Sequence, residues 1–230
     1  GCNPKIIVTC YQFFFTKIIN HMFLFIYILS SVILAKNINQ KRFIMPALTT
    51  PICDFGWKAP DFELIGTDGT NHSLTSIHGK NGTLVMFICN HCPYVKSVIH
   101  RIVEDCKVLQ ENDIGIIAVM SNDVNDPKYG HEDSFDNMQI FANDNSFSFP
   151  YVYDETQEVG KKYDAVCTPD FFGFNNNNEL QYRGRLEASQ QQLIPNSPKE
   201  LLEAMLQVAK TSKGPQEQIP SIGCSIKWKT

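Results

Sequence analysis

Apolar and polar residues alternate along the middle of the chain in a pattern that predicts a succession of strands and helices. Two continuous apolar runs, at residues 83–88 and 114–120, are typical of strands buried on both faces. Between these runs, apolar residues recur at helical spacing from Val95 to Leu109, and Pro93 fits the first position of a helix, where its missing N–H costs nothing. The strand, helix and strand together predict a parallel, right-handed βαβ unit.

The pattern predicts further elements on both sides of this unit. Asp68-Gly69 is a strong turn signal and predicts a hairpin before the first buried strand. The elements expected after the unit are a helix capped by Ser134, a strand at residues 150–153, a helix from Thr156 that includes Val166, a hairpin around residues 175–178, and a helix that a capping box at Ser197–Glu200 begins and Gly214 ends. This order predicts a single α/β domain without internal repeats.

Residues 1–44 differ in composition from the rest of the chain. They contain no acidic residue, and the segment at residues 18–35 is apolar enough to span a bilayer marginally. They could be upstream sequence translated ahead of a start at Met45, a membrane anchor, or a signal peptide. The absence of acidic residues favours the first. We therefore expect a leader at residues 1–44, a folded domain at residues 45–214 and a C-terminal tail at residues 215–230.

The composition limits the possible partners and the compartment. Five of the 20 Lys and Arg precede Met45 and all 24 Asp and Glu follow it, so the rest of the chain carries a formal charge of −9. This acidic balance gives no reason to expect nucleic-acid binding. A membrane is an expected partner only if residues 18–35 form a true anchor. Apart from one C-x-x-C motif the eight cysteines are scattered, which indicates free thiols in a reducing compartment and favours the cytoplasm.

The C-x-x-C motif, Cys89 and Cys92, is the strongest candidate for chemistry. It lies between a buried strand and a helix, and the N-terminus of a helix stabilises a thiolate. The spacing also allows the two sulfurs to form a disulfide. Because no second C-x-x-C exists, a zinc site would need His91 or the distant Cys167 or Cys224. We expect no metal or cofactor, with a metal-binding or redox-silent interaction module as the non-enzymatic alternative.

A second motif, Val166-Cys167-Thr168-Pro169, lies just before the expected hairpin. Together with the strand, cysteine pair and helix, it resembles the thioredoxin superfamily. The resemblance implies a thioredoxin-like fold, with a central mixed sheet flanked by helices, an N-terminal hairpin extension and an extra strand–helix insertion. It also implies that Pro169 is a cis-proline beside the cysteines, and that Thr168 pairs through its backbone with an extended substrate chain.

The segments before the cysteine pair narrow this resemblance. Trp57-Lys58-Ala59-Pro60-Asp61-Phe62 and Gly79-Lys80 resemble the opening of the alkyl hydroperoxide reductase/thiol-specific antioxidant branch, and the motif C-N-H-C-P-Y is similar to that of peroxiredoxin-like proteins. The resemblance extends over about residues 53–210. It implies a thiol–disulfide oxidoreductase in which Cys89 attacks a protein disulfide, Cys92 resolves the mixed disulfide, and an unknown thiol donor supplies electrons. His91 is expected to stabilise the thiolate.

The same branch offers a thiol peroxidase as an alternative. Peroxiredoxins carry P-x-x-x-T-x-x-C-P, and alignment on Cys92-Pro93 places Val85 at the proline and Cys89 at the threonine. Cys92 would then be the peroxidatic cysteine, which peroxide converts to a sulfenic acid. The residues expected to resolve that sulfenic acid are Cys89, Cys167 or Cys224, and those expected to polarise peroxide are Arg183 or Arg185.

Overall fold

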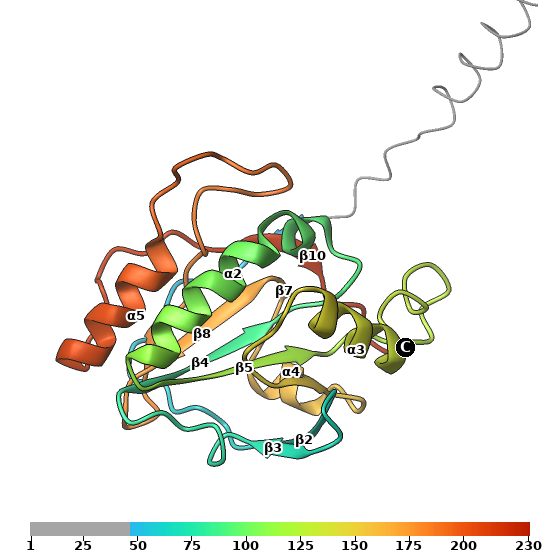
Figure 1. The fold of residues 1–230 in the computed structure, drawn as a ribbon, viewed down its shortest axis with the longest axis horizontal. Coiled ribbons are helices and arrows are strands. Elements are labelled where there is room, and N and C mark those ends of the chain that lie inside the picture. Colours follow the sequence, from blue (N-terminus) through green and yellow to red (C-terminus); the bar gives the residue numbers. More distant parts are fainter. Residues whose placement is uncertain (1–46) are drawn as a thin grey trace, which may run out of the picture. The chain divides into compact units, whose positions relative to one another are not determined.

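The computed structural model describes residues 47–230 of the chain (Figure 1). The leader expected at residues 1–44, including the apolar segment 18–35, lies outside the described residues. The strands are β1 (Ala47–Thr49), β2 (Glu63–Gly66), β3 (Asn71–Ser73), β4 (Gly82–Phe87), β5 (Ile114–Met120), β6 (Tyr151–Tyr153), β7 (Cys167–Thr168), β8 (Asp170–Phe174), β9 (Leu180–Tyr182) and β10 (Ile222–Ser225). The helices are α2 (Pro93–Glu111), α3 (Phe135–Asp144), α4 (Glu158–Lys162) and α5 (Glu200–Thr211).

Seven of the strands form a central mixed sheet in the order β3-β2-β6-β5-β4-β8-β9. The neighbours β4 and β5 run parallel, as do β5 and β6, whereas the other adjacent pairs are antiparallel. The predicted βαβ unit is therefore present as β4, α2 and β5. The N-terminal hairpin β2–β3 joins the edge of this sheet through β6.

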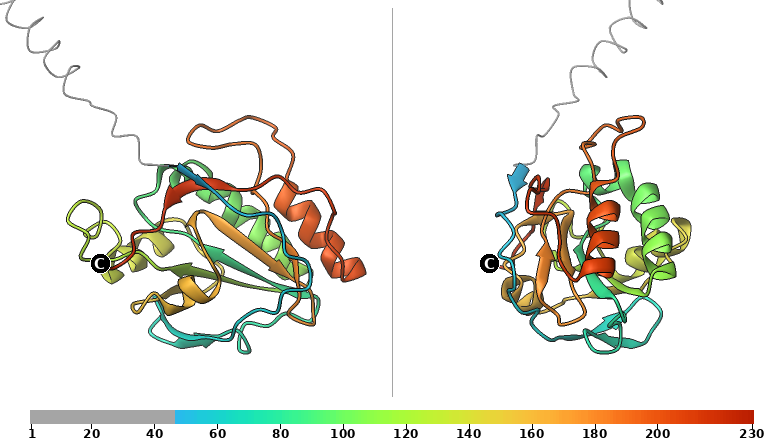
Figure 2. Two further views of the ribbon diagram at one scale, coloured as in Figure 1. Left: turned by 180° about the vertical axis from the view of Figure 1, so that it is seen from behind. Right: turned by 90° about the vertical axis from the view of Figure 1, so that its left-hand side faces the viewer.

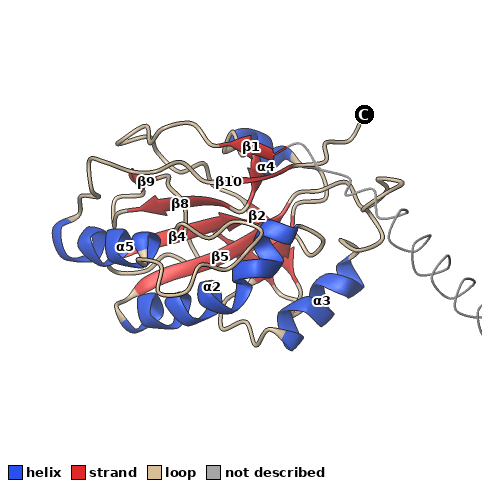
Figure 3. Ribbon diagram, turned by 90° about the horizontal axis from the view of Figure 1, so that it is seen from above, coloured by secondary structure: helices blue, strands red, loops and turns tan. Residues whose placement is uncertain are grey.

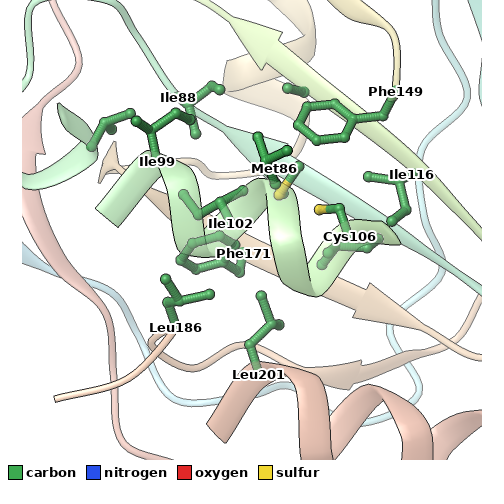
Figure 4. Packing of buried hydrophobic residues seen from close by; sticks show 14 of the residues in the cluster. Met86, Ile88, Ile99, Ile102, Cys106, Ile116, Phe149, Phe171, Leu186 and Leu201 are labelled. Carbon is green, nitrogen blue, oxygen red and sulfur yellow. The ribbon is translucent and has the colours of Figure 1, made fainter. Parts of the chain in front are cut away.

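The sheet has a hydrophobic core on each face, and β4 contributes to both. Leu84 and Met86 point into one core, and Val85 and Phe87 into the other, as the alternation of side chains along a strand requires. Helices α2, α3 and α5 cover the first core, and α4 lies on the opposite side of the sheet (Figure 3). The first core also contains Cys106, which packs near Met86 as expected for a buried thiol (Figure 4). Helices on both faces explain why β4 and β5 are continuously apolar.

A second, smaller sheet joins segments that are far apart in the sequence. Its strand order is β1-β10-β7, and both pairs are antiparallel. Figure 2 shows β1 in blue beside β10 in red. The structure differs here from the expected tail at residues 215–230, because Ile222–Ser225 form β10 and Gly223 and Cys224 are buried. A strand of four residues gives too short a pattern to be detected without its partner strands.

The predicted start of the last helix is wrong in detail. Helix α5 begins at Glu200 with Lys199 as its N-cap, and no side chain caps it. The hydroxyl of Ser197 instead accepts a hydrogen bond from the backbone N–H of Ala188, and Glu200 pairs with Arg185. The capping box is therefore absent because tertiary partners compete for both of its side chains.

The helix expected from Thr156 is shorter than its pattern suggests. Helix α4 ends at Lys162, and Asp164 adopts a left-handed backbone conformation with φ of 50°, which takes Val166 out of the helix.

None of the helices within residues 47–230 is both long enough and apolar enough to cross a membrane.

Candidate active site

Cys89 and Cys92 lie at the junction of β4 and α2, as expected. Cys89 follows the end of β4 by two residues, and Cys92 is the N-cap of α2, with Pro93 as the first helical residue. No side-chain hydrogen bond caps this helix, but the backbone N–H of Val95 in its first turn contributes to lowering the pKa of Cys92. The unpaired N–H groups and the dipole of this helix end favour a negative charge on that sulfur. Both cysteines are buried, with 1% and 0% of their surface exposed.

Thr168 touches both cysteines of the pair. Its Oγ1 lies 3.3 Å from the Sγ of Cys89, and its carbonyl oxygen lies 3.0 Å from the Sγ of Cys92 and accepts a hydrogen bond from that thiol. The peptide bond between Thr168 and Pro169 is cis, as the resemblance implies. The segment expected to dock a substrate is therefore packed against the cysteine pair.

The two further candidate cysteines differ in where they lie. Cys167 is buried in β7, but its thiol approaches the carbonyl oxygen of Pro169, at 3.6 Å, rather than a sulfur. Cys224 is in β10, and its Sγ lies 2.9 Å from the Sγ of Cys92. The structure thus brings Cys224, from near the end of the chain, into direct contact with the motif.

His91 is held beside the pair by Asp133, a residue that no sequence motif indicates. The Nδ1 of His91 lies 2.6 Å from Oδ2 of Asp133 and 3.6 Å from the sulfur of Cys89. The Oδ1 of Asp133 accepts hydrogen bonds from the backbone N–H groups of Asn90 and His91, at 2.9 and 3.2 Å, and Asn122 donates to Oδ2 at 2.8 Å. One carboxylate therefore fixes the backbone and the imidazole of the motif together.

The environment of His91 also assigns its proton. The imidazole stacks on Tyr129 with ring centroids 4.5 Å apart, and its buried Nε2 has no hydrogen-bond partner. A buried N–H without a partner is costly. The Nδ1–H tautomer avoids this cost, because it donates to Asp133 and leaves only a lone pair on Nε2.

The pKa values of the three clustered thiols diverge. Burial raises the pKa of Cys89 well above its usual value. Burial would also raise the pKa of Cys92, but hydrogen bonds from Cys224 and Cys89 outweigh it and lower that pKa. The side chain of Thr168 adds to the lowering of the Cys92 pKa, whereas its carbonyl oxygen opposes it, since that oxygen interacts favourably only with the protonated thiol. The pKa of Cys224 is raised because its hydrogen bond to Cys92 stabilises the protonated form, and burial adds to this.

The directions of these pKa shifts bear on which cysteine sulfur attacks a substrate disulfide. A thiolate is the nucleophile in disulfide exchange, and Cys92 is the thiol whose charged form has the most hydrogen-bond donors. The motif order in thioredoxin-like reductases instead gives the attack to Cys89. Both assignments of role stay predictions.

The ligand atoms of Cys89, His91 and Asp133 lie within 4.8 Å of one another and could be considered for a metal. A metal ion would bind each ligand at about 2.0–2.3 Å and so would have to separate them. The 2.6 Å contact between His91 and Asp133 leaves no space between those two atoms. The carboxylate of Asp133 also accepts hydrogen bonds from Asn90 and Asn122. The group fits a hydrogen-bond network better than a metal site.

The two arginines considered for a peroxidase have other partners. Arg183 donates to Asp170, at 3.2 Å, and to the carbonyl oxygen of Asp164. Arg185 forms a bidentate ion pair with Glu200. Within residues 47–230, both guanidinium groups are therefore engaged by carboxylates rather than by the cysteine pair.

A surface cavity of about 270 Å³ opens beside this site. Pro169 lies in its wall together with Tyr94 from α2, and Ser221 and Ile222 from the start of β10. A substrate segment in this cavity would approach the cis-proline between α2 and β10.

Comparisons with known proteins give a family match and two similar solved structures. Residues 55–184, more than half of the chain, match the model of the AhpC/TSA family. An uncharacterised conserved protein from Geobacillus kaustophilus is 40% identical, with a TM-score of 0.76, over 80% of this chain and 97% of that one. A hypothetical protein from Sinorhizobium meliloti is 28% identical, with a TM-score of 0.74, over 80% of this chain and 100% of that one. No protein of curated function is similar enough to count as a match.

A more distant likeness bears on the fold alone. A protein from Chlorobium tepidum, provisionally assigned as the thiol:disulfide interchange protein DsbE, has a TM-score of 0.50 at 21% identity, over 68% of this chain and 98% of that one. The expected thioredoxin-like fold, with a mixed sheet flanked by helices, is confirmed.

Proposed function

Because the chain belongs to the AhpC/TSA family, whose members carry out thiol-based redox chemistry, we propose that it is a thiol–disulfide oxidoreductase with Cys89 and Cys92 as its active dithiol. The observation that carries this proposal is the position of Cys92. It is the N-cap residue of α2, and the thiols of Cys89 and Cys224 and the backbone N–H of Val95 lower the pKa of its thiol. No other buried thiol in residues 47–230 combines a helix N-terminus with a neighbouring thiol as a resolving partner.

The reaction we propose begins at Cys92. Its thiolate attacks one sulfur of a protein disulfide, which forms a mixed disulfide and releases the other sulfur as a thiolate. The thiolate of Cys89 then attacks the Cys92 sulfur and releases the second substrate thiol. The substrate gains two electrons and two protons, and Cys89 and Cys92 become a disulfide. A thiol donor of the cell would reduce this disulfide again.

Cys89 must lose its proton for the second step, although burial raises its pKa. We assign this proton to the substrate thiolate that the first step releases, and the Nδ1–H of His91, which lies 3.6 Å from the Cys89 sulfur and is hydrogen-bonded to Asp133, then faces the new thiolate. Thr168 and Pro169, beside the 270 Å³ cavity, would dock the substrate.

Two observations support exchange over peroxide reduction. Cys89 occupies the position of the peroxiredoxin threonine, and it provides a second thiol at the site. Arg183 and Arg185 are paired with Asp170 and Glu200. A peroxidase with Cys92 as its peroxidatic residue keeps one point in its favour, which is the lowered pKa of that thiol.

Serine substitutions at Cys89 and Cys92 test the proposal. With dithiothreitol as donor, we expect the protein to reduce insulin disulfides, and Cys92→Ser to abolish the activity. Without dithiothreitol, the double variant Cys89→Ser/Cys224→Ser should retain the first attack and accumulate a mixed disulfide between Cys92 and the substrate, because Cys224, 2.9 Å from Cys92, can no longer displace it. Cys106→Ser is the control, because this buried thiol of α2 lies in the hydrophobic core.

The same variants, assayed with hydrogen peroxide, separate the two enzymes. If the protein consumes peroxide in a manner that depends on Cys92, and insulin is not reduced by any variant, the oxidoreductase proposal is wrong and the peroxidase is correct.

A further inference from the structure

Strand β10 occupies the edge of β7, which is the edge expected to pair with an extended substrate. Cys224 lies opposite Thr168 and Ser225 opposite Cys167 in an antiparallel register. On its other side β10 pairs with β1, with Cys224 opposite Ala47 (Figure 2). A segment of the same chain, with a cysteine aligned on the residue before the cis-proline, therefore takes the place of a substrate.

The close approach of β10 to β7 depends on Gly223. A Cβ atom at this position would lie 2.0 Å from the carbonyl oxygen of Thr168, a backbone atom that cannot move aside alone. The serine before β10 adds to the attachment, since the hydroxyl of Ser221 donates to the carbonyl oxygen of Pro169 at 2.7 Å. These contacts hold the Cys224 sulfur against Cys92 rather than in solvent.

The distance between the two sulfurs suits covalent exchange. They are 2.9 Å apart, both fully buried, and a disulfide bond measures about 2.05 Å. The remaining described cysteines have other surroundings. Cys106 lies in the core, Cys167 faces the carbonyl oxygen of Pro169, and half-buried Cys53 has its pKa raised to about 11 by burial. Among the cysteines of residues 47–230 outside the motif, Cys224 is the one that contacts the motif's sulfurs.

We propose that Cys224 is a third redox thiol of this site, and that Cys92 exchanges its disulfide between Cys89 and Cys224. This proposal rests on the proposed function, which supplies the Cys89–Cys92 disulfide. The thiolate of Cys224 attacks the sulfur of Cys92, so that the Cys92–Cys224 bond forms and the Cys89–Cys92 bond breaks. Cys89 leaves as a thiolate and takes up the proton that Cys224 lost. No external oxidant or reductant is needed, because one disulfide replaces another.

The exchange has a consequence for the site. With the disulfide between Cys92 and Cys224, β10 is covalently attached to the N-terminus of α2 and stays on the edge of β7. Cys89 becomes a free thiol again, and its neighbours are His91 and Thr168. When all three thiols are reduced, β10 is held to β7 only by hydrogen bonds and packing, and a substrate segment can compete for that edge.

Disulfide mapping tests the proposal. The full chain is oxidised with glutathione disulfide, quenched with acid, alkylated and digested, and the linked peptides are identified by mass spectrometry. In the unaltered protein we expect both the Cys89–Cys92 and the Cys92–Cys224 linkages. Cys89→Ala should contain the Cys92–Cys224 linkage in most molecules, and Cys224→Ala only the Cys89–Cys92 linkage. Cys106→Ala is the matched control and should show the same linkages as the unaltered protein.

The outcomes separate this proposal from the proposed function. Circular dichroism first checks that Cys89→Ala is folded. If this variant then accumulates glutathione on Cys92 without forming a bond to Cys224, and the unaltered protein forms only the Cys89–Cys92 disulfide, Cys224 is not a redox thiol. The proposed oxidoreductase function would be unaffected by that result. If the unaltered protein forms neither linkage, the proposed function fails. If Cys89→Ala does not fold, the linkages in the unaltered protein decide the question alone.

Discussion

At the scale of single residues, Asp133 holds the site together although it does not itself carry out the exchange. It accepts hydrogen bonds from the backbone of Asn90 and His91, from the amide of Asn122 and from the imidazole of His91. Hydrogen bonds to a charged group contribute about 1.5–3 kcal/mol each, more than bonds between neutral groups. Because all four bonds lie in a buried region, the loss of the charge cannot be compensated by water.

We expect Asp133→Asn to lower the free energy of unfolding by about 2–4 kcal/mol, because the amide presents a donor where the carboxylate accepted. Urea unfolding measures this loss. Glu132→Gln is the matched control, since Glu132 is half-exposed and its ion pair with Lys96 is on the surface. Such a pair contributes at most about 1 kcal/mol. Equal losses in the two variants would contradict the role given to Asp133.

The residues of the site differ in how far the sequence reveals them. Cys89, Cys92 and the pair Thr168-Pro169 are found because each belongs to a motif of neighbouring residues. Asp133 approaches His91 from a loop 42 residues further along the chain. That loop has no apolar periodicity, and its acidic residues look alike in sequence. The partner of His91 could therefore be identified only from the folded structure.

At the scale of elements, β10 illustrates what a local pattern cannot show. The buried strands β4 and β5 have six and seven residues, long enough for their apolar character to be recognised. Strand β7 has two residues and β10 has four, and both are defined by the strands beside them. The sequence predicts a cysteine near the end of the chain as a candidate resolving residue, but only the pairing of β10 with β7 places it at Cys92.

Gly223 offers a test of that pairing. We expect Gly223→Ala to push β10 away from β7, because the new Cβ would overlap the carbonyl oxygen of Thr168. In the disulfide map, the Cys92–Cys224 linkage should fall at least several-fold while Cys89–Cys92 persists. Ser225→Ala is the control within the same strand, since this side chain contacts Lys227. An unchanged Cys92–Cys224 linkage in folded Gly223→Ala would contradict the role of the close approach.

At the scale of the whole molecule, the fold follows from a few strong patterns. The apolar β4 and β5 and the amphipathic α2 between them define the centre of the sheet, and helices on both faces bury it. The hairpin β2–β3 was expected as an extension, and it extends the same sheet through β6. The start of α5 was less predictable, because the long-range partners of Ser197 and Glu200 decided it, and the early end of α4 follows from the left-handed backbone at Asp164. The cysteine pair gains its properties from four separate parts of the chain: α2, the loop of Asp133, β7 and β10.

Under the proposed function, this arrangement makes Cys92 part of a reversible disulfide. The most direct measurement is a titration of the full protein in buffers of graded ratios of reduced to oxidised glutathione, with acid quenching and counting of the free thiols. We expect a single transition in which two thiols disappear together, and we expect Cys92→Ala to abolish it. If Cys89, Cys92 and Cys224 all remain free thiols across the whole range in the folded protein, the cysteine pair is not a redox dithiol.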